Sequence, residues 1–169
     1  MKTLVDQLSQ YAAYHRDSRN IATHFVGIPL IVLAVFVLLA RPHFVLFGLS
    51  FTPALLVFIA SSIFYFRLSL VYGLAMFAIH GVLLSLANHI AVQTFPVWLS
   101  VGVGVFVLGW VIQFVGHYFE GRKPAFVDDL IGLAVGPLFV VAELGFIVGL
   151  GKQIERDIES RSGPVRRQS

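Results

Sequence analysis

A nearly uncharged central stretch constrains this chain more than any other feature of its sequence. Between His24 and Val115 it carries two charged side chains, Arg41 and Arg67, and no carboxylate. Of the whole chain, 12% is charged and 57% is hydrophobic, whereas soluble domains average about 25% and 45–50%. A formal net charge of +3 is too small to indicate nucleic-acid binding. The sequence therefore predicts a small polytopic membrane protein and excludes a soluble globule, a disordered chain and a nucleic-acid-binding protein.

Five apolar segments are candidates to cross a bilayer. A hydrocarbon core about 30 Å thick requires roughly 20 apolar residues in a helix. The segments lie at about 24–40, 44–66, 68–92, 95–116 and 130–150. We expect an all-α, helical membrane bundle with four to five spans, formed by residues 1–151 as a single domain. Residues 152–169 carry eight charges and a Ser-Gly-Pro break, which predicts a flexible tail.

A further helix is expected over residues 3–16, before the first span. Leu4, Leu8, Tyr11 and His15 recur at the spacing of one helical face, with most of the polar residues elsewhere. This pattern predicts an amphipathic helix that lies in the membrane interface or docks on the bundle.

The distribution of positive charge predicts which side of the membrane each connection occupies. With five spans, the N-terminus, the connection at Arg67 and the loop 117–129 share one side, which carries six cations against Arg41 alone on the other. Short cytoplasmic loops are enriched in Lys and Arg, so we expect this side to be cytoplasmic. The basic tail then falls on the opposite side. A last segment that breaks at Gly136-Pro137 and returns would remove this conflict, but its length fits a span better, and we favour a crossing segment.

Three of the six histidines fall on the same predicted side of the membrane. His15 lies on the apolar face of the N-terminal helix, His24 begins the first span and His117 ends the fourth. Imidazole is a favoured ligand of iron, copper, nickel and zinc, and three around one ion suffice for an oxygen-activating centre. The alternative for any one of them is an interfacial histidine whose tip reaches water. The chain has no cysteine, which excludes thiolate nucleophiles and iron–sulfur clusters.

Polar neighbours favour the metal hypothesis. Gln113 and Glu120 flank His117 at helical spacing, and Asn20 lies one turn before His24. A carboxylate or amide beside a ligating imidazole fixes its tautomer and orientation. We therefore expect Glu120 to complete or orient the site.

Two positively charged residues follow Glu120 in the sequence. Arg122 and Lys123 are candidates to hold a substrate carboxylate or a lipid phosphate, and charges that only set the topology are the alternative.

Two ionisable residues lie at depth within predicted spans, His80 in the third and Glu143 in the fifth. Such residues indicate function by default, with hydrogen bonding to a neighbouring helix as the alternative. His43 and His89 fall on the opposite side of the membrane from the other histidines, and we expect them to be bystanders.

Two segments together resemble the Mpo1-like family. Residues Tyr11–Leu30 (YAAYHRDSRNIATHFVGIPL) match its opening pattern of Tyr, His, Asn, His, Gly and Pro. Residues Trp110–Glu143 carry its Gln-Phe-x-Gly-His, Phe-Glu-Gly-Arg and Pro-Ala elements. The two blocks flank a divergent hydrophobic middle, so the resemblance extends over nearly the whole chain to Glu143.

The resemblance implies a polytopic membrane enzyme. Its characterised members include an Fe(II)-dependent dioxygenase of the fungal endoplasmic reticulum that shortens 2-hydroxy fatty acids by one carbon, a fatty acid α-oxidation. It implies Fe(II) as the cofactor, with O₂ and a long-chain 2-hydroxy fatty acid as substrates at the bilayer interface. The implied metal ligands are His15, His24 and His117, and we expect catalytic roles for Glu120 and Arg122. A non-catalytic lipid-binding or assembly protein and another membrane lipid oxidase are the alternatives.

The expected location is an integral membrane position with the active face towards the cytoplasm. The basic tail and the lack of an evident organelle signal fit a bacterial inner membrane, and the endoplasmic reticulum is expected for a eukaryotic chain. The sequence does not indicate an oligomeric state.

Overall fold

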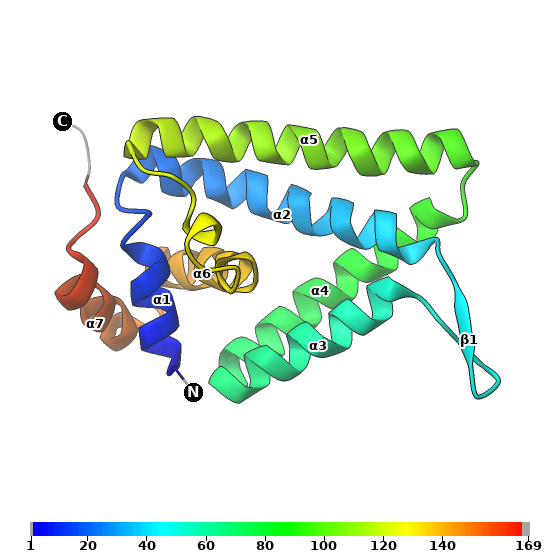
Figure 1. Cartoon of the computed structure of the whole chain (residues 1–169). Helices are drawn as coiled ribbons and strands as arrows, with labels where there is room; N and C mark the ends of the chain where they lie inside the picture. The colour runs from blue at the N-terminus through cyan, green and yellow to red at the C-terminus, as the bar shows by residue number, and fades with distance from the viewer. Residues whose placement is uncertain (1, 167–169) are drawn as a thin grey trace. The chain divides into compact units, whose positions relative to one another are not determined.

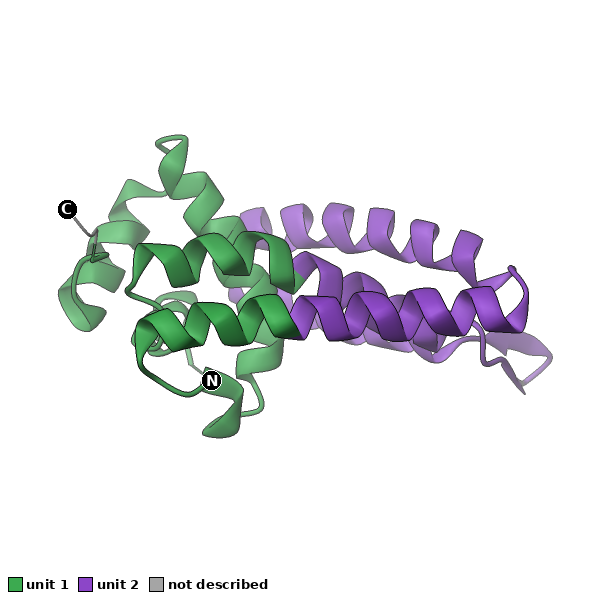
Figure 2. Ribbon diagram, turned by 90° about the horizontal axis from the view of Figure 1, so that it is seen from above, with its two compact units in different colours: residues 1–28, 111–169 green, residues 29–110 purple. Residues whose placement is uncertain are grey.

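The structure, a computed structural model, describes residues 2–166, most of which are α-helical. Its elements are α1 (Leu4–Ala12), α2 (Ser18–Ala40), β1 (Phe44–Leu46), β2 (Leu49–Phe51), α3 (Pro53–Leu68), α4 (Leu70–Ala91), α5 (Phe95–Glu120), the 3₁₀-helix η1 (Ala125–Val127), α6 (Gly132–Ile147) and α7 (Lys152–Ser162) (Figure 1). They form two compact units, the first from the residues up to 28 and from 111 onward, the second from residues 29–110 (Figure 2). The all-α fold predicted from the apolar segments is confirmed.

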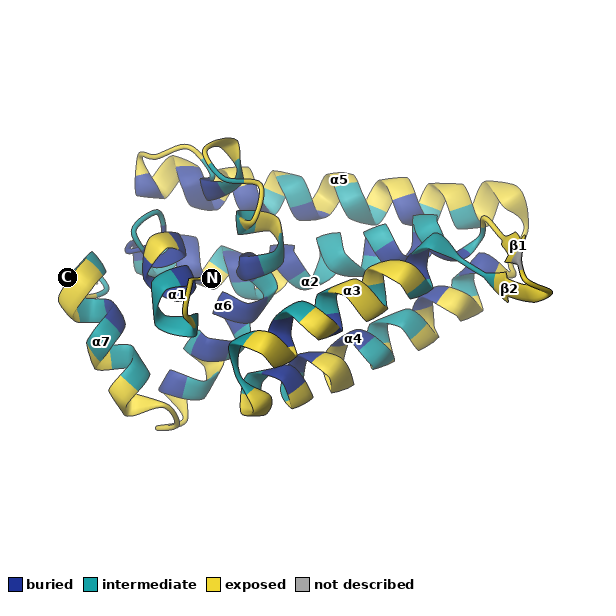
Figure 3. Cartoon of the chain, turned by 60° about the horizontal axis from the view of Figure 1, so that its bottom comes forward, coloured by how far each residue is buried: buried dark blue, intermediate teal, exposed yellow. Residues whose placement is uncertain are grey.

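Three of the described helices, α2, α4 and α5, are long and apolar enough to cross a membrane. Their most apolar windows have mean hydropathies of 2.5, 2.0 and 2.1. Apolar side chains of α4 and α5 are exposed, among them Leu74, Val82 and Val107, each more than half exposed. Both helices carry exposed stretches along their length (Figure 3). Exposed apolar surface of this extent is typical of contact with lipid. The chain is therefore a polytopic helical membrane protein.

The second unit is organised by the antiparallel helices α3 and α4. Ser69 separates them in extended conformation, and its hydroxyl caps the start of α4. Small residues on three helices, Ala40, Ala54 and Ala87, are almost fully buried beside Phe36, because small side chains let apolar helices approach closely.

The segment predicted to span residues 44–66 begins with a β-hairpin instead. Strands β1 and β2 pair antiparallel around Phe47 and Gly48, both of which have positive φ. Thr52 then caps α3, with Pro53 at the first helical position. These turn and capping residues delay the helix, so α3 has 16 residues and a length of only about 24 Å.

The first unit contains α1, η1, α6 and α7 with the adjoining ends of α2 and α5. Helix α1 is fixed at its start by a capping box between Thr3 and Asp6. It ends at Ala12, earlier than the predicted residue 16, so His15 lies on the turn between α1 and α2 rather than on the helix.

The predicted flexible tail is wrong for residues 152–162, which form α7. Ile158 is 1% exposed, and α7 packs on α1, where Arg161 and Asp6 form an ion pair of 2.7 Å. High charge suggested disorder, but one buried apolar position and partners on α1 are sufficient to fix the helix.

The last apolar segment has both of its flanks on α1. Before α6, Asp129 accepts a hydrogen bond from Gln10, and after it α7 contacts α1. Helices α6 and α7 are bent by 116° relative to each other. Helix α1 has nine residues and is about 14 Å long. The two flanks that contact it therefore cannot lie on opposite faces of a hydrocarbon core about 30 Å thick. We therefore prefer a returning segment over the crossing one that we expected, with its bend between α6 and α7 rather than at Gly136-Pro137, which lie inside α6.

Candidate metal centre

His15, His24 and His117 converge at the centre of the first unit. Their exposed fractions are 0%, 1% and 7%. One nitrogen from each ring lies within 4.8 Å of the other two, and the ring centroids are 4.4–5.2 Å apart. The three residues that the sequence placed on one membrane face thus lie together, although His117 is 93 residues beyond His24.

The hydrogen bonds of the His15 and His24 rings leave one nitrogen of each ring available as a metal ligand. Nδ1 of His15 donates to the carbonyl of Tyr11 (2.7 Å), and Nδ1 of His24 to the carbonyl of Asn20 (2.8 Å). Each ring then has Nε2 as its remaining nitrogen, with an available lone pair. Nε2 of His15 and Nδ1 of His117 are buried without a partner. Buried polar atoms normally have partners, and one metal ion shared by the three imidazoles would supply them.

Aromatic packing shields the cluster. The ring of Tyr11 stacks on that of His15 at 4.1 Å, and Phe139 lies at 5.7 Å from His15. Burial, followed by the neighbouring His24, holds the pKa of His15 well below its ordinary value. The ring is therefore neutral at pH 7, which is the form that binds metals.

Close approach of α5 to α2 at Gly116 brings His117 to the other two histidines. A Cβ atom at position 116 would overlap Thr23 Oγ1 and lie 2.5 Å from Asn20 Oδ1. Only glycine allows this approach without displacement.

Alanine at Gly116 should therefore separate α5 from α2 and weaken the histidine cluster. We expect a loss of stability of about 1–3 kcal/mol from overpacking and at least tenfold weaker metal binding. Gly104, which lies on the same helix with open space around it, is the matched control. Unfolding temperature and Co(II) titration measure the two effects, and equal behaviour of the two variants would contradict the explanation.

Glu120 holds the loop between His15 and His24. Its Oε2 accepts hydrogen bonds from the backbone N–H of Arg16 (3.0 Å) and Asp17 (2.8 Å) and from the side-chain amide of Asn20 (3.1 Å). With this oxygen occupied by three donors, the carboxylate is arranged to orient the loop rather than to ligate a metal. Of the two roles expected for Glu120, the structure supports orientation.

The other predicted polar residues lie around the cluster. Arg122 is exposed and donates to the carbonyl of Ala13 (2.8 Å) at the end of α1, while Lys123 pairs with Asp128 (2.6 Å). Gln113 is buried on α5, and its Nε2 has no partner.

The remaining candidates do not belong to the cluster of three histidines. In the second unit, His80 is buried, and its Nδ1 lies 3.3 Å from the hydroxyl of Ser61. Glu143 pairs with Arg16 (3.4 Å). His43 and His89, expected to be bystanders, are exposed and belong to the second unit.

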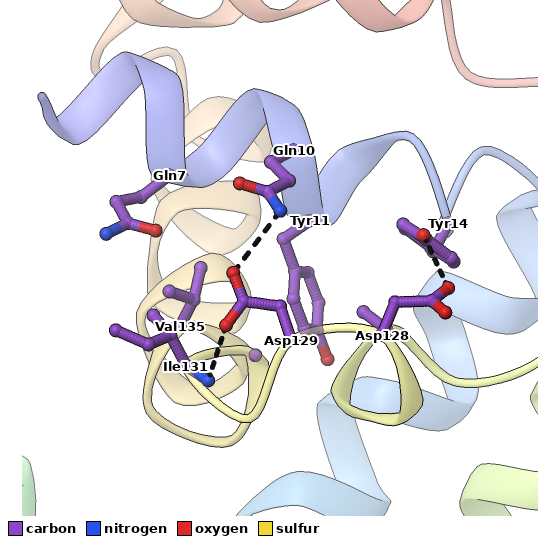
Figure 4. Close-up of a pocket in the computed structure, with 10 residues that line it drawn as sticks. Gln7, Gln10, Tyr11, Tyr14, Asp128, Asp129, Ile131 and Val135 are labelled. Carbon is purple, nitrogen blue, oxygen red and sulfur yellow. Dashed lines mark hydrogen bonds between the residues drawn. The ribbon is translucent and has the colours of Figure 1, made fainter. Parts of the chain in front are cut away.

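Sequence reasoning missed the contacts that hold the loop after α5 against α1. Tyr14 donates to Asp128 (2.8 Å) and Gln10 to Asp129 (3.4 Å), along a shallow pocket between α1 and the start of α6 (Figure 4). Asp129 also accepts from the backbone N–H of Ile131 (3.0 Å). The two adjacent aspartates were the available signal, because Asp side chains often accept hydrogen bonds from nearby backbone N–H groups in turns.

Comparison with known proteins gives two significant matches. The Mpo1-like family, described as "2-hydroxy-palmitic acid dioxygenase Mpo1-like", matches over residues 1–147. The 2-hydroxy-palmitic acid dioxygenase MPO1 of Saccharomyces cerevisiae is 34% identical over 172 aligned positions, which cover 98% of this chain and 95% of the yeast protein. No solved structure matches the chain significantly.

Proposed function

The chain belongs to the Mpo1-like family, and we propose that it is an Fe(II)-dependent dioxygenase that shortens long-chain 2-hydroxy fatty acids by one carbon. The observation that supports this proposal is the cluster of three buried imidazoles whose nitrogens face one another, two of them without partners. The yeast relative is named as a dioxygenase of 2-hydroxy-palmitic acid, which is an amphiphile of the kind that a membrane-interface site would bind.

The proposed reaction consumes the 2-hydroxy acid and O₂ and gives the acid one carbon shorter, CO₂ and water. His15, His24 and His117 would hold Fe(II), which supplies O₂ activation and chelation of the substrate hydroxyl and carboxylate when bound. Tyr11 and Phe139 pack around the His15 ring and exclude water from it.

Around this centre, two polar residues have supporting roles in the proposal. Glu120 keeps the loop between two of the histidines in place through its hydrogen bonds. Arg122 lies on the loop after α5, is exposed and donates to a carbonyl at the end of α1. It is the candidate to hold the substrate carboxylate by a charge-assisted hydrogen bond.

The activity is tested with purified protein, Fe(II) and O₂. We expect 2-hydroxypalmitic acid to be converted to the acid one carbon shorter, detected by mass spectrometry, and chelation of the metal to abolish the conversion. Hydroxy acids of other chain lengths establish the range of substrates. Palmitic acid, which lacks the chelating hydroxyl, is the matched control and should not react. Failure of every 2-hydroxy acid to react in a metal-dependent way would favour a non-catalytic lipid-binding protein.

With α2, α3, α4 and α5 as the crossing helices, the proposed site faces the cytoplasm, because the short-loop cations favour that side by six to one. Single cysteines at exposed positions Gln10, Lys123 and Ser160 should all react with a membrane-impermeant thiol reagent from the cytoplasmic side only. Ser160 lies on α7, so its labelling also tests the returning path of the last apolar segment. Labelling of Ser160 from the opposite side would restore the crossing segment.

A further inference from the structure

The C-terminal segment following α7 runs along the loop that joins His15 to α2. The backbone N–H of Arg166 donates to the carbonyl of Arg16 (2.7 Å), and the N–H of Ser18 donates to the carbonyl of Arg166 (3.1 Å). These two bonds form a parallel bridge between Asp17 and Arg166. Residues 163–166, here called the C-terminal strap, thus pair with the turn between two of the three histidines.

The side chain of Arg166 adds a second connection to the same loop. Its Nη2 donates to Oε1 of Glu120 (2.5 Å). The side chain of Glu120 is only 1% exposed, and its other oxygen accepts from Arg16 N–H and Asp17 N–H. The carboxylate therefore connects the strap on one side to the histidine loop on the other.

The strap is anchored from its own start as well. The carbonyl of Gly163 accepts from Nη1 of Arg16 (3.1 Å), and the hydroxyl of Ser162 donates to the carbonyl of Ser9 on α1 (2.7 Å). The guanidinium of Arg16 also donates through Nε to the carbonyl of His15 (2.9 Å). Two hydrogen bonds of the strap, one from Arg166 and one to Gly163, thus involve Arg16, the residue directly after His15.

From these contacts we infer that the C-terminal strap positions the metal centre, with Arg166 as the positioning residue that acts through Glu120. The inference rests on the proposed function, because it assigns the three histidines as metal ligands. The strap lies beyond residues 1–147 that the family description matches. Hydrogen-bond partners behind the ligands commonly change metal affinity by 10–100-fold, and a strap that fixes the ligand-bearing loop belongs to this class of contact.

The test measures Co(II) binding to the full-length protein by its visible absorption, without reference to turnover. We expect Arg166→Ala to weaken Co(II) binding about tenfold and to alter the absorption spectrum, and Arg166→Lys to restore most of the affinity. A chain that ends at Gly163 should lose more than Arg166→Ala, because it also lacks the backbone bridge. Adding Arg166→Ala to Glu120→Gln should have little further effect, since the two residues act in one connection.

Arg161→Ala is the matched control, because Arg161 pairs with the partly exposed Asp6 and, within the described residues 2–166, is not hydrogen-bonded to the histidine loop. It should bind Co(II) within twofold of the unaltered protein. Unchanged affinity and spectrum in Arg166→Ala, or an equal loss in Arg161→Ala, would overturn the inference.

Hydrogen exchange of the Arg16 and Asp17 amides provides a readout that needs no metal. Both amides are held by Glu120, so their exchange should accelerate in Arg166→Ala and stay unchanged in Arg161→Ala. An unaltered protein that binds no Co(II) would contradict the metal centre of the proposed function. The exchange rates would then decide alone whether the strap holds the loop, and equal rates in both variants would show that it does not.

Discussion

Alanine at His15, His24 or His117 should abolish bound iron and turnover together, while the protein still inserts into the membrane. Each substitution removes one of three ligands, and the ligand nitrogens lie within 4.8 Å of one another, so none of the remaining pairs can hold the ion equally well. We expect at least a hundredfold loss of product formation and a fall of bound iron to background. Elemental analysis of purified protein and mass spectrometry of the product measure the two quantities.

His43→Ala and His89→Ala are the matched controls for this prediction. Both histidines are exposed, and both belong to the unit that does not contain the cluster, so their removal should change iron content and turnover by less than twofold. Full iron occupancy in His117→Ala would contradict the three-ligand centre. Equal losses in the controls would show that the effect comes from general damage to the protein.

The positions of the histidines could be predicted from the sequence to the level of a membrane face, but no further. The ends of the apolar segments place His24 and His117 on one side, and the apolar face of the first helix adds His15. Their convergence depends on how closely two helices approach, and this is set by Gly116 against Thr23. A glycine in an apolar helix is compatible with many packings, so the sequence alone does not identify its partner.

The errors in the predicted fold have a common cause, which is that composition was considered without the turns and the distant contacts that decide the structure. The charged residues from 152 onward predict disorder when taken alone, yet Ile158 is buried, α7 packs on α1 and Arg161 pairs with Asp6. Similarly, apolar residues near Phe47 resemble the start of a span until the turn at Gly48 is considered. Arg166 and Glu120, 46 residues apart, have no local signal that pairs them.

Removal of the Glu120 carboxylate should destabilise the first unit strongly. Glu120→Ala leaves the buried N–H groups of Arg16 and Asp17 without their acceptor and removes the partner of Arg166. Loss of a buried, charged acceptor costs about 2–4 kcal/mol. We expect a decrease of this size in the free energy of unfolding, measured by chemical denaturation in detergent, together with weaker metal binding.

Comparison with two other variants separates the possible causes of this loss. Glu120→Gln keeps one acceptor oxygen but removes the negative charge, so it should retain part of the stability if its carbonyl faces the loop amides. Glu155→Ala removes a partly exposed carboxylate that pairs with the exposed Lys152 on α7, and surface pairs contribute only about 0–1 kcal/mol. If Glu120→Ala were no less stable than Glu155→Ala, the hydrogen bonds to the histidine loop would contribute little, and the loop would have to be held by the strap backbone and by the packing of Tyr11 on His15.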